Sequence, residues 1–433
     1  MTPDTSIYIH IPFCKHRCAY CDFNTYAGQE DSIPAYVDAV IREIDFVGMG
    51  IQQVRDSASQ RDTHSTIHTV FFGGGTPSLL SAPQFDSILQ ALRAPFTFTT
   101  DAEISIEANP GTISPEKLNA IRASGINRIS FGVQSANTEE LRMLERIHDF
   151  FTVIEAVSTA RKAGFDNLNL DLIYGLPEQT LSTWQTTLQR IVDLHPEHIS
   201  AYALTLEHGT PFGRWSSKGL LPFPDPDLAA GMYEYAEEFL VGNGYVNYEI
   251  SNWALDYGQQ TMDHDSSSTV NGLPSFACKH NLQYWRSLPY LAFGAGAHGY
   301  ANGYRYSNAL RIKTYIERLI HPSSFTRSVH PFPISPATVN QHKQTLKEDM
   351  SEYMLNNLRL TNAGVAESDF RLRFGRGLLD VYPKEIEELI QIGLLECKTS
   401  EFFAQRPAGK NSEVYRLTKR GRLLGNQVFM RFV

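Results

Sequence analysis

The chain has few cysteines and no long apolar segment. It contains five cysteines in 433 residues, and three of them, Cys14, Cys18 and Cys21, fall close together. An odd, clustered count argues against a disulfide framework and favours a metal site. No apolar run approaches the ~20 residues of a membrane span, and the N-terminus lacks the pattern of a signal or transit peptide. We therefore expect a cytosolic protein, with peripheral contact to a membrane left open.

An excess of positive charge is also missing. The sequence has 38 Lys and Arg against 47 Asp and Glu, a net charge of −9. A chain of this charge is not built to coat a polyanion. Its hydrophobic fraction of 42% and charged fraction of 20% are ordinary for a soluble globular protein.

Short strands alternate with helices in the first 250 residues. Apolar or alternating runs predict the strands Ser6–Ile11, Ile67–Phe72, Glu103–Ala108, Arg128–Gly132, Asn167–Leu172 and His198–Ala203. Helical spacing and end signals predict the helices Pro34–Gly48, Ser114–Ser124, Phe151–Ala163 and Leu181–Leu194. This alternation implies a parallel sheet, and six strands are fewer than the eight of a closed barrel. We expect an α/β fold, a partial (β/α)6 TIM-like barrel over residues 1–250 with ligands at the carboxyl ends of its strands.

Two further regions follow the barrel. Residues 251–334 are expected to extend it and to include a polar inserted loop, Asp256–Ser275. Residues 335–433 predict a mostly helical, winged-helix-like domain, with helices Asn340–Leu360, Glu367–Phe374, Pro383–Ile392 and Thr418–Arg431 and strands Leu394–Lys398 and Glu413–Leu417. Such a domain either packs against the rest of the protein or binds nucleic acid. Its 15 Lys and Arg against 12 Asp and Glu are a weak electrostatic footprint, so we do not expect nucleic-acid binding.

The three clustered cysteines have the spacing C-x3-C-x2-C directly after the first predicted strand. Thiolates are soft ligands that suit iron–sulfur clusters. Three of them can hold three irons of a cubane and leave the fourth iron open for the amino and carboxylate groups of a small ligand. One alternative is zinc, with His10 or His16 completing the ligand set, and the other is a coincidental spacing.

The segment Tyr8-Ile-His-Ile-Pro-Phe-Cys14 and the cysteine spacing resemble the radical S-adenosylmethionine superfamily. Within it, the chain is similar to the oxygen-independent coproporphyrinogen III oxidase group and its heme-chaperone branch, HemW, along nearly its whole length. The resemblance implies a [4Fe-4S] cluster on Cys14, Cys18 and Cys21, and S-adenosyl-L-methionine as cofactor. The oxidases carry a further cysteine two residues after the third, where this chain has Phe23. The segment His280-Asn-Leu-Gln-Tyr284-Trp285 is similar to the H-N-x-x-Y-W motif of the heme-chaperone branch.

Polar and glycine residues at several strand ends form a candidate cofactor site. A glycine triplet alone is compatible with a tight turn, and a lone polar residue is commonly a hydrogen-bonded core residue. Carboxylates converging on one barrel mouth can accept from ribose hydroxyls or an amine, and an arginine can bind a carboxylate or be a solvated charge. The resemblance implies cofactor contacts by Gly74, Gly75 and Thr76 of a GGGTP motif, by Glu107, Gln134, Arg146 and Asp171, and more loosely by Tyr8, Tyr20, Thr205 and His298.

The segment around His280 has two interpretations. His280 is a candidate axial heme ligand, with Tyr284 and Trp285 covering a flat macrocycle. The other interpretation is an aromatic packing cluster with a hydrogen-bonded histidine. Cys278 is a second candidate iron ligand, or else a small buried apolar residue.

The resemblance implies a heme chaperone that binds heme and delivers it to acceptor cytochromes. The alternative is a coproporphyrinogen III dehydrogenase, which oxidatively decarboxylates two propionates to vinyl groups in porphyrin biosynthesis, so whether the protein is an enzyme stays open. The implied partners are heme or a porphyrin, heme proteins such as respiratory cytochromes, and an electron donor for the cluster. A homodimer is left open.

Overall fold

The computed structural model describes residues 5–57, 66–256, 273–321, 335–399 and 413–433. The chain forms two compact units. Unit 1 comprises Met1–Pro196, Ala203–Asp225 and Leu288–Lys343, and therefore holds the three clustered cysteines. Unit 2 comprises Glu197–Tyr202, Pro226–Ser287 and Gln344–Val433, and holds His280.

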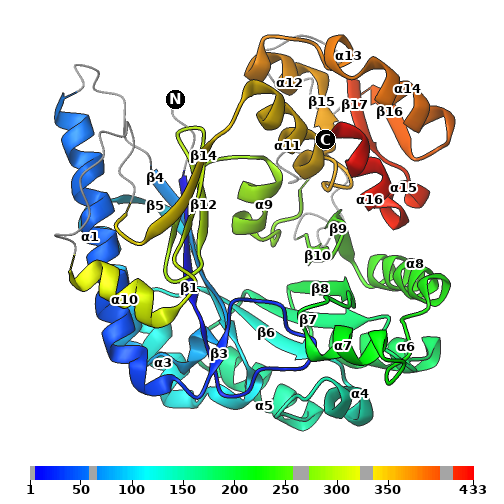
Figure 1. Cartoon of the computed structure of the whole chain (residues 1–433). Coiled ribbons are helices and arrows are strands. Elements are labelled where there is room, and N and C mark those ends of the chain that lie inside the picture. Colours follow the sequence, from blue (N-terminus) through cyan, green and yellow to red (C-terminus); the bar gives the residue numbers. More distant parts are fainter. Residues whose placement is uncertain (1–4, 58–65, 257–272, 322–334, 400–412) are drawn as a thin grey trace, which may run out of the picture. The chain divides into compact units, whose positions relative to one another are not determined.

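A twisted sheet forms the centre of unit 1 (Figure 1). Its strands lie in the order β14 (Thr338–Lys343), β13 (Tyr304–Asn308), β12 (His298–Ala301), β11 (Tyr290–Phe293), β1 (Thr5–Ile11), β4 (Thr66–Gly74), β5 (Thr97–Ala108), β6 (Arg128–Gln134) and β7 (Leu168–Tyr174). The pairings from β11 to β7 are parallel, and those from β11 to β14 are antiparallel. Parallel strands bring all their carboxyl ends to one edge of the sheet.

Helices connect the parallel strands. They are α1 (Ile33–Ser57), α2 (Ala82–Arg93), α3 (Pro115–Ala123), α4 (Thr138–Met143), α5 (Phe150–Lys162) and α6 (Leu181–Val192), with α7 (Pro211–Ser217) and α10 (Ile312–Ile320) later in the chain. Several of these helices have a polar N-cap residue whose side chain accepts a hydrogen bond from a first-turn N–H group. These N-cap residues are Ser114, Asn137, Asp149 and Thr180. Helices α1 and α10 lie side by side (Figure 1).

A buried carboxylate joins α1 to the segments that follow β11. Glu43 is 1% exposed. Its oxygens accept from the N–H of Gly294 at 2.9 Å, Asn308 Nδ2 at 2.8 Å, the Tyr315 hydroxyl at 2.6 Å and the Ser335 hydroxyl at 2.5 Å. Burial raises the pKa of Glu43, and the four donors act in the opposite direction. Because these donors follow Glu43 by 251 to 292 residues, the carboxylate connects α1 to four much later positions of unit 1.

Unit 2 begins with a small antiparallel arrangement. Most of β8 (His198–Ala203) belongs to unit 2. It pairs with β10 (Asn252–Leu255), and β10 pairs in turn with β9 (Tyr245–Glu249). The helices α8 (Pro226–Gly242) and α9 (Lys279–Trp285) also belong to this unit.

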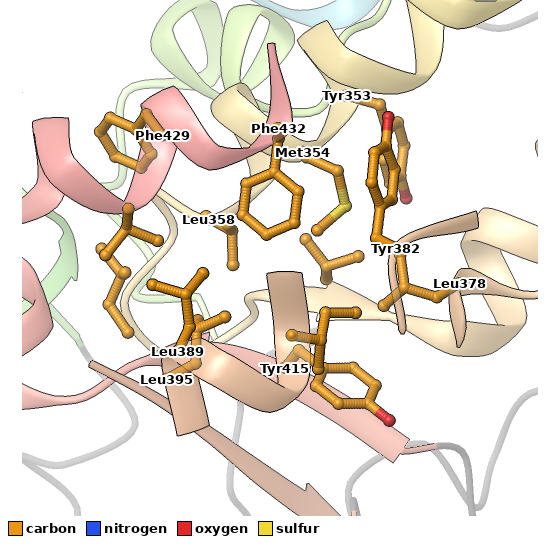
Figure 2. Close-up of a cluster of buried hydrophobic side chains, with 14 of the residues drawn as sticks. Tyr353, Met354, Leu358, Leu378, Tyr382, Leu389, Leu395, Tyr415, Phe429 and Phe432 are labelled. Atoms are coloured by element: carbon orange, nitrogen blue, oxygen red, sulfur yellow. The ribbon is translucent and has the colours of Figure 1, made fainter. Parts of the chain in front are cut away.

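The C-terminal part of unit 2 is mostly helical. Its elements are α11 (Leu346–Asn357), β15 (Val365–Ala366), α12 (Glu367–Phe374), α13 (Leu378–Val381), α14 (Pro383–Gln391), β16 (Leu395–Thr399), β17 (Glu413–Leu417), α15 (Lys419–Leu423) and α16 (Gly425–Phe429). The short strands lie in the order β15-β17-β16. Buried apolar side chains from these helices and strands form one core (Figure 2). Within it, the rings of Tyr382 and Phe432 meet edge to face with centroids 5.3 Å apart.

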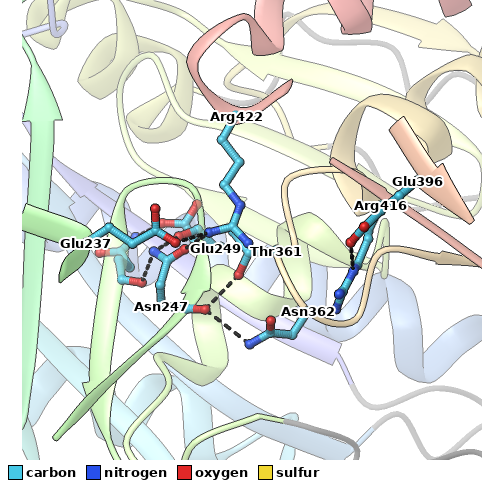
Figure 3. A network of polar contacts seen from close by, with 9 residues as sticks. Glu237, Asn247, Glu249, Thr361, Asn362, Glu396, Arg416 and Arg422 are labelled. Carbon is cyan, nitrogen blue, oxygen red and sulfur yellow. Dashed lines mark hydrogen bonds and ion pairs between the residues drawn. The ribbon is translucent and has the colours of Figure 1, made fainter. Parts of the chain in front are cut away.

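A polar network fastens the C-terminal part to α8 and β9 (Figure 3). Arg422 Nη1 lies 2.8 Å from Glu237 Oε1 and 3.3 Å from Asn247 Oδ1. The Thr361 hydroxyl donates to the Asn247 carbonyl oxygen at 2.6 Å. The Arg422 and Glu237 side chains are only 12% and 16% exposed, so removing either one would leave a poorly solvated charge.

The expected fold class, a partial (β/α)6 barrel followed by a winged-helix-like domain, is confirmed. Strands β8 and β17 have the predicted bounds, and the other predicted strands form with shifted ends. Among the elements that were not predicted are strand β11 and the helices α2, α8 and α10. The capping box formed by Ser81 and Gln84 is a sequence signal for α2.

Three helix predictions differ from the structure, two of them at their ends and one in the middle. Helix α1 continues past Gly48, because that glycine marks close packing: a Cβ there would lie 2.5 Å from the Cβ of Pro95. Residues Thr338–Lys343, partly assigned to a helix, pair with β13, and α11 starts only after the capping residue Thr345. The helix predicted over Thr418–Arg431 breaks at Leu424 between α15 and α16.

The inserted loop and the wing lie mostly outside the described residues, at 257–272 and 400–412. No helix in the described ranges combines the length and hydropathy that crossing a membrane requires. The division of the chain at residues 250 and 335 stays a prediction.

Candidate functional site

The cysteine loop starts directly at the end of β1. Cys14 lies in β2 (Phe13–Cys14), which pairs with β3 (Tyr26–Ala27) and so closes the loop between them. The N–H of Cys21 donates to the carbonyl of Cys18 at 3.1 Å. Cys14 is buried, whereas Cys18 and Cys21 are partly exposed. All three thiols therefore belong to one closed loop at the carboxyl end of the strand.

Each of the three sulfurs has its own polar neighbour. The Thr76 hydroxyl donates to Cys14 Sγ at 3.6 Å, Arg146 Nη1 donates to Cys18 Sγ at 3.7 Å, and Thr25 Oγ1 lies 3.8 Å from Cys21 Sγ. Hydrogen-bond donors and a guanidinium stabilise thiolates, which are the form that binds metal.

Burial raises the pKa of the Cys14 thiol, and the nearby Cys21 and Cys18 raise it further, while the Thr76 hydrogen bond lowers it. A cation bound among the three sulfurs would favour their thiolate forms, and thiolates are the ligands that hold iron–sulfur clusters. The donor set fits an iron–sulfur cluster. Within the described residues, no group of three or more His, Cys, Asp or Glu side chains is arranged to hold one metal ion.

The glycine turn after β4 packs against the cysteine loop. The N–H of Gly75 donates to the Ile11 carbonyl at 2.9 Å, and that of Thr76 donates to the Phe13 carbonyl at 2.7 Å. A Cβ at Gly75 would lie 2.6 Å from the Phe13 oxygen. Gly74 has φ +110°, and a Cβ there would lie 2.3 Å from the His10 ring. Larger residues are therefore excluded at both positions.

The strand register brings polar residues into rows across the sheet. His10 lies opposite Gly73, Glu107 opposite Ser130, and Gly132 opposite Asp171. Because side chains alternate along a strand, residues two apart share one face. Tyr8, Glu107 and Asp171, the predicted site residues of β1, β5 and β7, therefore share one face of the sheet.

Glu107 and Asp171 are the two carboxylates of this face. Burial raises the pKa of Glu107 to about 7; the Asp171 charge raises it too, and the Gly74 N–H and Arg128 lower it. The Gly74 N–H donates to Glu107 Oε2 at 2.9 Å. Asp171 accepts from Ser130 Oγ and Asn169 Nδ2, both at 2.7 Å. Sequence reasoning missed Ser130 and Asn169, although the spacing of two between Asn169 and Asp171 predicts a shared face.

A hydrogen-bonded chain holds the loop after the third cysteine. The Tyr8 hydroxyl lies 2.9 Å from His10 Nδ1, and His10 Nε2 lies 2.9 Å from the Asn24 carbonyl oxygen. Because a carbonyl can only accept, His10 carries its proton on Nε2. Asn24 Nδ2 in turn donates to the carbonyls of Ala295 and Leu310, each at 3.1 Å. Both His10 ring nitrogens are occupied, which favours a positioning role over zinc ligation.

Arg146 spans the site between β6 and the cysteines. Besides contacting Cys18, it donates from Nη2 to the Gly132 carbonyl at 2.7 Å. Its buried Nε has no hydrogen-bond partner among the described residues, so the site has an unused donor for a bound acceptor. Gln134 ends β6 in the left-handed region, with φ 72°.

The remaining predicted cofactor residues differ in their placement. Tyr20 packs against Phe212 with ring centroids 6.4 Å apart, and burial raises the pKa of its phenol. His298 is exposed at the start of β12, near enough to His10 to lower the pKa of that imidazole. Thr205 is exposed in the segment between β8 and α7.

The structure places His280, Tyr284 and Trp285 on α9 in unit 2. His280 is 1% exposed, and its Nε2 lies 2.8 Å from the Tyr284 hydroxyl. The guanidinium of Arg359 lies 4.5 Å from the centre of the Trp285 ring. Cys278 is also buried. A heme iron can reach His280 Nε2 only if the Tyr284 hydroxyl moves away.

Comparison with known proteins assigns both parts of the chain. Residues 8–191 match the Radical SAM superfamily, and residues 344–404 match the HemN C-terminal domain. The chain is 34% identical over 429 residues to the heme chaperone HemW of Bacillus subtilis strain 168, covering 99% of both. It is 32% identical over 437 residues to that of Escherichia coli K12, covering 100% of this chain and 98% of the other. The coproporphyrinogen III oxidase HemN of Escherichia coli has a similar fold, with a TM-score of 0.73 and 23% identity over 100% of this chain and 90% of the other.

Proposed function

Since this chain belongs to the HemW family within the radical SAM superfamily, we propose that it is a heme chaperone that binds heme, a [4Fe-4S] cluster and S-adenosyl-L-methionine and delivers heme to acceptor cytochromes. The cysteine loop carries this proposal. It offers three thiols with separate polar neighbours, and Phe23, 67% exposed, stands where the oxidases have a further cysteine. The full-length relatives with the name heme chaperone support the same assignment.

Cys14, Cys18 and Cys21 would hold three irons of the cluster. The bound cluster supplies an electron and an open iron for the cofactor. Thr76 and Arg146 donate to two of the sulfurs and so stabilise their thiolate form. The burial of Cys14 keeps water from one side of this site.

The polar face beside the cluster would hold S-adenosyl-L-methionine. Glu107 and Asp171 offer carboxylate oxygens for amine or hydroxyl donors, and the free N–H of Arg146 offers a donor for a carboxylate. Gly74 and Gly75 form a turn without side chains, and the next residue, Thr76, contributes a hydroxyl group. We include Gln134, Tyr8, Tyr20, His298 and Thr205 in the proposed site on the family resemblance.

Heme would bind at α9. His280 is the proposed axial ligand, and Tyr284 and Trp285 are proposed to contact the macrocycle. Since the Tyr284 hydroxyl occupies His280 Nε2 at 2.8 Å, binding would require a local rearrangement of this helix.

The test is anaerobic purification followed by separate heme-binding and turnover assays. We expect the protein to bind heme and to leave coproporphyrinogen III unchanged in the presence of a reductant and S-adenosyl-L-methionine. Robust formation of protoporphyrinogen IX would contradict the chaperone proposal and would support the oxidase function in its place.

A further inference from the structure

A small pocket opens beside the cysteine loop of unit 1. Cys18 and Thr76 line it, together with Lys15, His16 and Ile147. Cys18 and Thr76 are partly exposed, whereas Lys15, His16 and Ile147 are exposed. The Thr76 hydroxyl contacts Cys14 Sγ. A molecule seated here would therefore touch Cys18 itself and a residue bonded to Cys14.

The surface at this pocket is positive in a chain of net charge −9. Lys15, His16 and Arg17 are consecutive and exposed. Lys117 lies near enough to Lys15 for the two ammonium groups to repel, and this repulsion adds to burial in lowering the pKa of Lys117. Among the described residues that line the pocket, Glu145 is the only acidic one.

Glu145 forms a hydrogen bond with the neighbouring His16. Its Oε2 lies 3.0 Å from His16 Nε2. Lys15 and Arg146 of the lining and the adjacent Arg17 outnumber this one carboxylate, so the field that an approaching molecule meets is positive. Next to them, Ile147 exposes 55% of its surface and offers an apolar contact. A small apolar contact beside several cationic side chains is typical of transient protein interfaces that form by electrostatic attraction.

We propose that Lys15, His16, Arg17 and Ile147 form a docking surface for an acidic protein that carries single electrons. This inference rests on the proposed function, because it requires the cluster. The reduced carrier loses one electron and the cluster, in its 2+ state, gains it, with no bond made or broken. Cys18 on the pocket wall places the carrier next to a cluster ligand. Charge complementarity accelerates such encounters and makes their rate depend on salt.

The test compares Lys15→Gln and Lys15→Glu in reconstituted full-length protein, with Lys313→Glu on α10 as the matched control. Lys313 is 88% exposed and lies outside the pocket. Cluster content and its electron paramagnetic resonance signal are measured first. Reduction is then followed in a stopped-flow instrument by the loss of visible cluster absorbance, with reduced flavodoxin as the acidic carrier. Reduced methyl viologen, a small cation, is the second reductant.

We expect the second-order rate constant with flavodoxin to fall about threefold in Lys15→Gln and about tenfold in Lys15→Glu at low salt. The graded effect follows because the first change removes one charge and the second reverses it. The differences should shrink at about 0.5 M salt, where the screening length is a few ångströms. Lys313→Glu should react like the unmodified protein.

Methyl viologen should reduce every variant at least as fast as the unmodified protein. Equal flavodoxin rates in all variants, with intact clusters that viologen reduces, would overturn the docking surface alone. An unmodified protein that holds no cluster after reconstitution would overturn the proposed function and this inference together.

Discussion

Replacing Glu107 by Gln should change how the stability of the protein depends on pH. Glu107 has a pKa of about 7 in the folded chain against 4.5 for an ordinary glutamate, chiefly because it is buried. A raised pKa means that the folded state binds the proton more tightly than the unfolded state. The stability that the neutral carboxyl provides is therefore present below pH 4.5 and is lost as the pH rises through about 7.

The size of this loss follows from the two pKa values. Each pKa unit corresponds to about 1.4 kcal/mol, so ionising Glu107 in the folded state costs about 3 kcal/mol. Between pH 5 and pH 8 the free energy of unfolding should fall by about 2 kcal/mol through this group. The amide of Glu107→Gln cannot ionise, and its side-chain oxygen can still accept from the Gly74 N–H. The free energy of unfolding of the variant should not show this fall, so it should rise relative to that of the unmodified protein as the pH increases.

The assay is equilibrium urea unfolding of the cluster-free protein at pH 5, 6.5 and 8, followed by circular dichroism. Glu155→Gln is the control, since Glu155 is exposed on α5. Its stability difference from the unmodified protein should not vary with pH. If the difference for Glu107→Gln is also constant between pH 5 and pH 8, the carboxyl does not titrate in a buried site and the reasoning fails.

Three further changes give separate tests. Gly75→Ala should prevent cluster reconstitution, seen as missing visible absorbance, because its Cβ meets backbone oxygens; Gly111→Ala, with nothing within 4 Å, should reconstitute normally. Glu43→Gln should lower the free energy of unfolding by about 2 kcal/mol. Each carboxylate oxygen accepts from an N–H group, so the NH2 group of the glutamine would face a donor in either orientation of the amide. A decrease in the free energy of unfolding no larger than that of Glu155→Gln would contradict this. His280→Ala should shift or abolish the heme Soret band, and an unchanged band would remove His280 as a ligand.

The sequence was most informative where short-range chemistry determines structure. The cysteine spacing after β1 predicted a loop at a strand end, and Ser114 and Thr180 mark helix starts through their own side chains. Glycines were harder to interpret. Gly48 was read as a helix end, but its small size serves packing against Pro95, which is distant in sequence. Strand β14 depends on pairing with β13, and β11 on pairing with β1, so neither is determined by its own residues alone.

The candidate site shows the same division between local pattern and tertiary contact. The sequence predicted the thiols, which follow β1, and the carboxylates, which lie within β5 and β7, since the carboxyl ends of these strands share one edge. It did not predict that Thr25, Thr76 and Arg146 would each contact a different sulfur, because these contacts depend on how three segments fold together. The positive surface had a local signal, three consecutive basic residues between two cysteines, which a net charge of −9 obscured.

The α9 motif shows why a sequence pattern does not fix a ligand. Residues four apart on a helix are neighbours, so the spacing of His280 and Tyr284 already predicts their contact. That contact has opposite consequences for the two interpretations of the motif. It satisfies a buried histidine in a packing cluster, and it blocks the nitrogen that heme iron would need. Heme binding through His280 therefore requires that the gain from the iron–nitrogen bond exceed the loss of one buried hydrogen bond, about 1 kcal/mol, together with the packing of Tyr284.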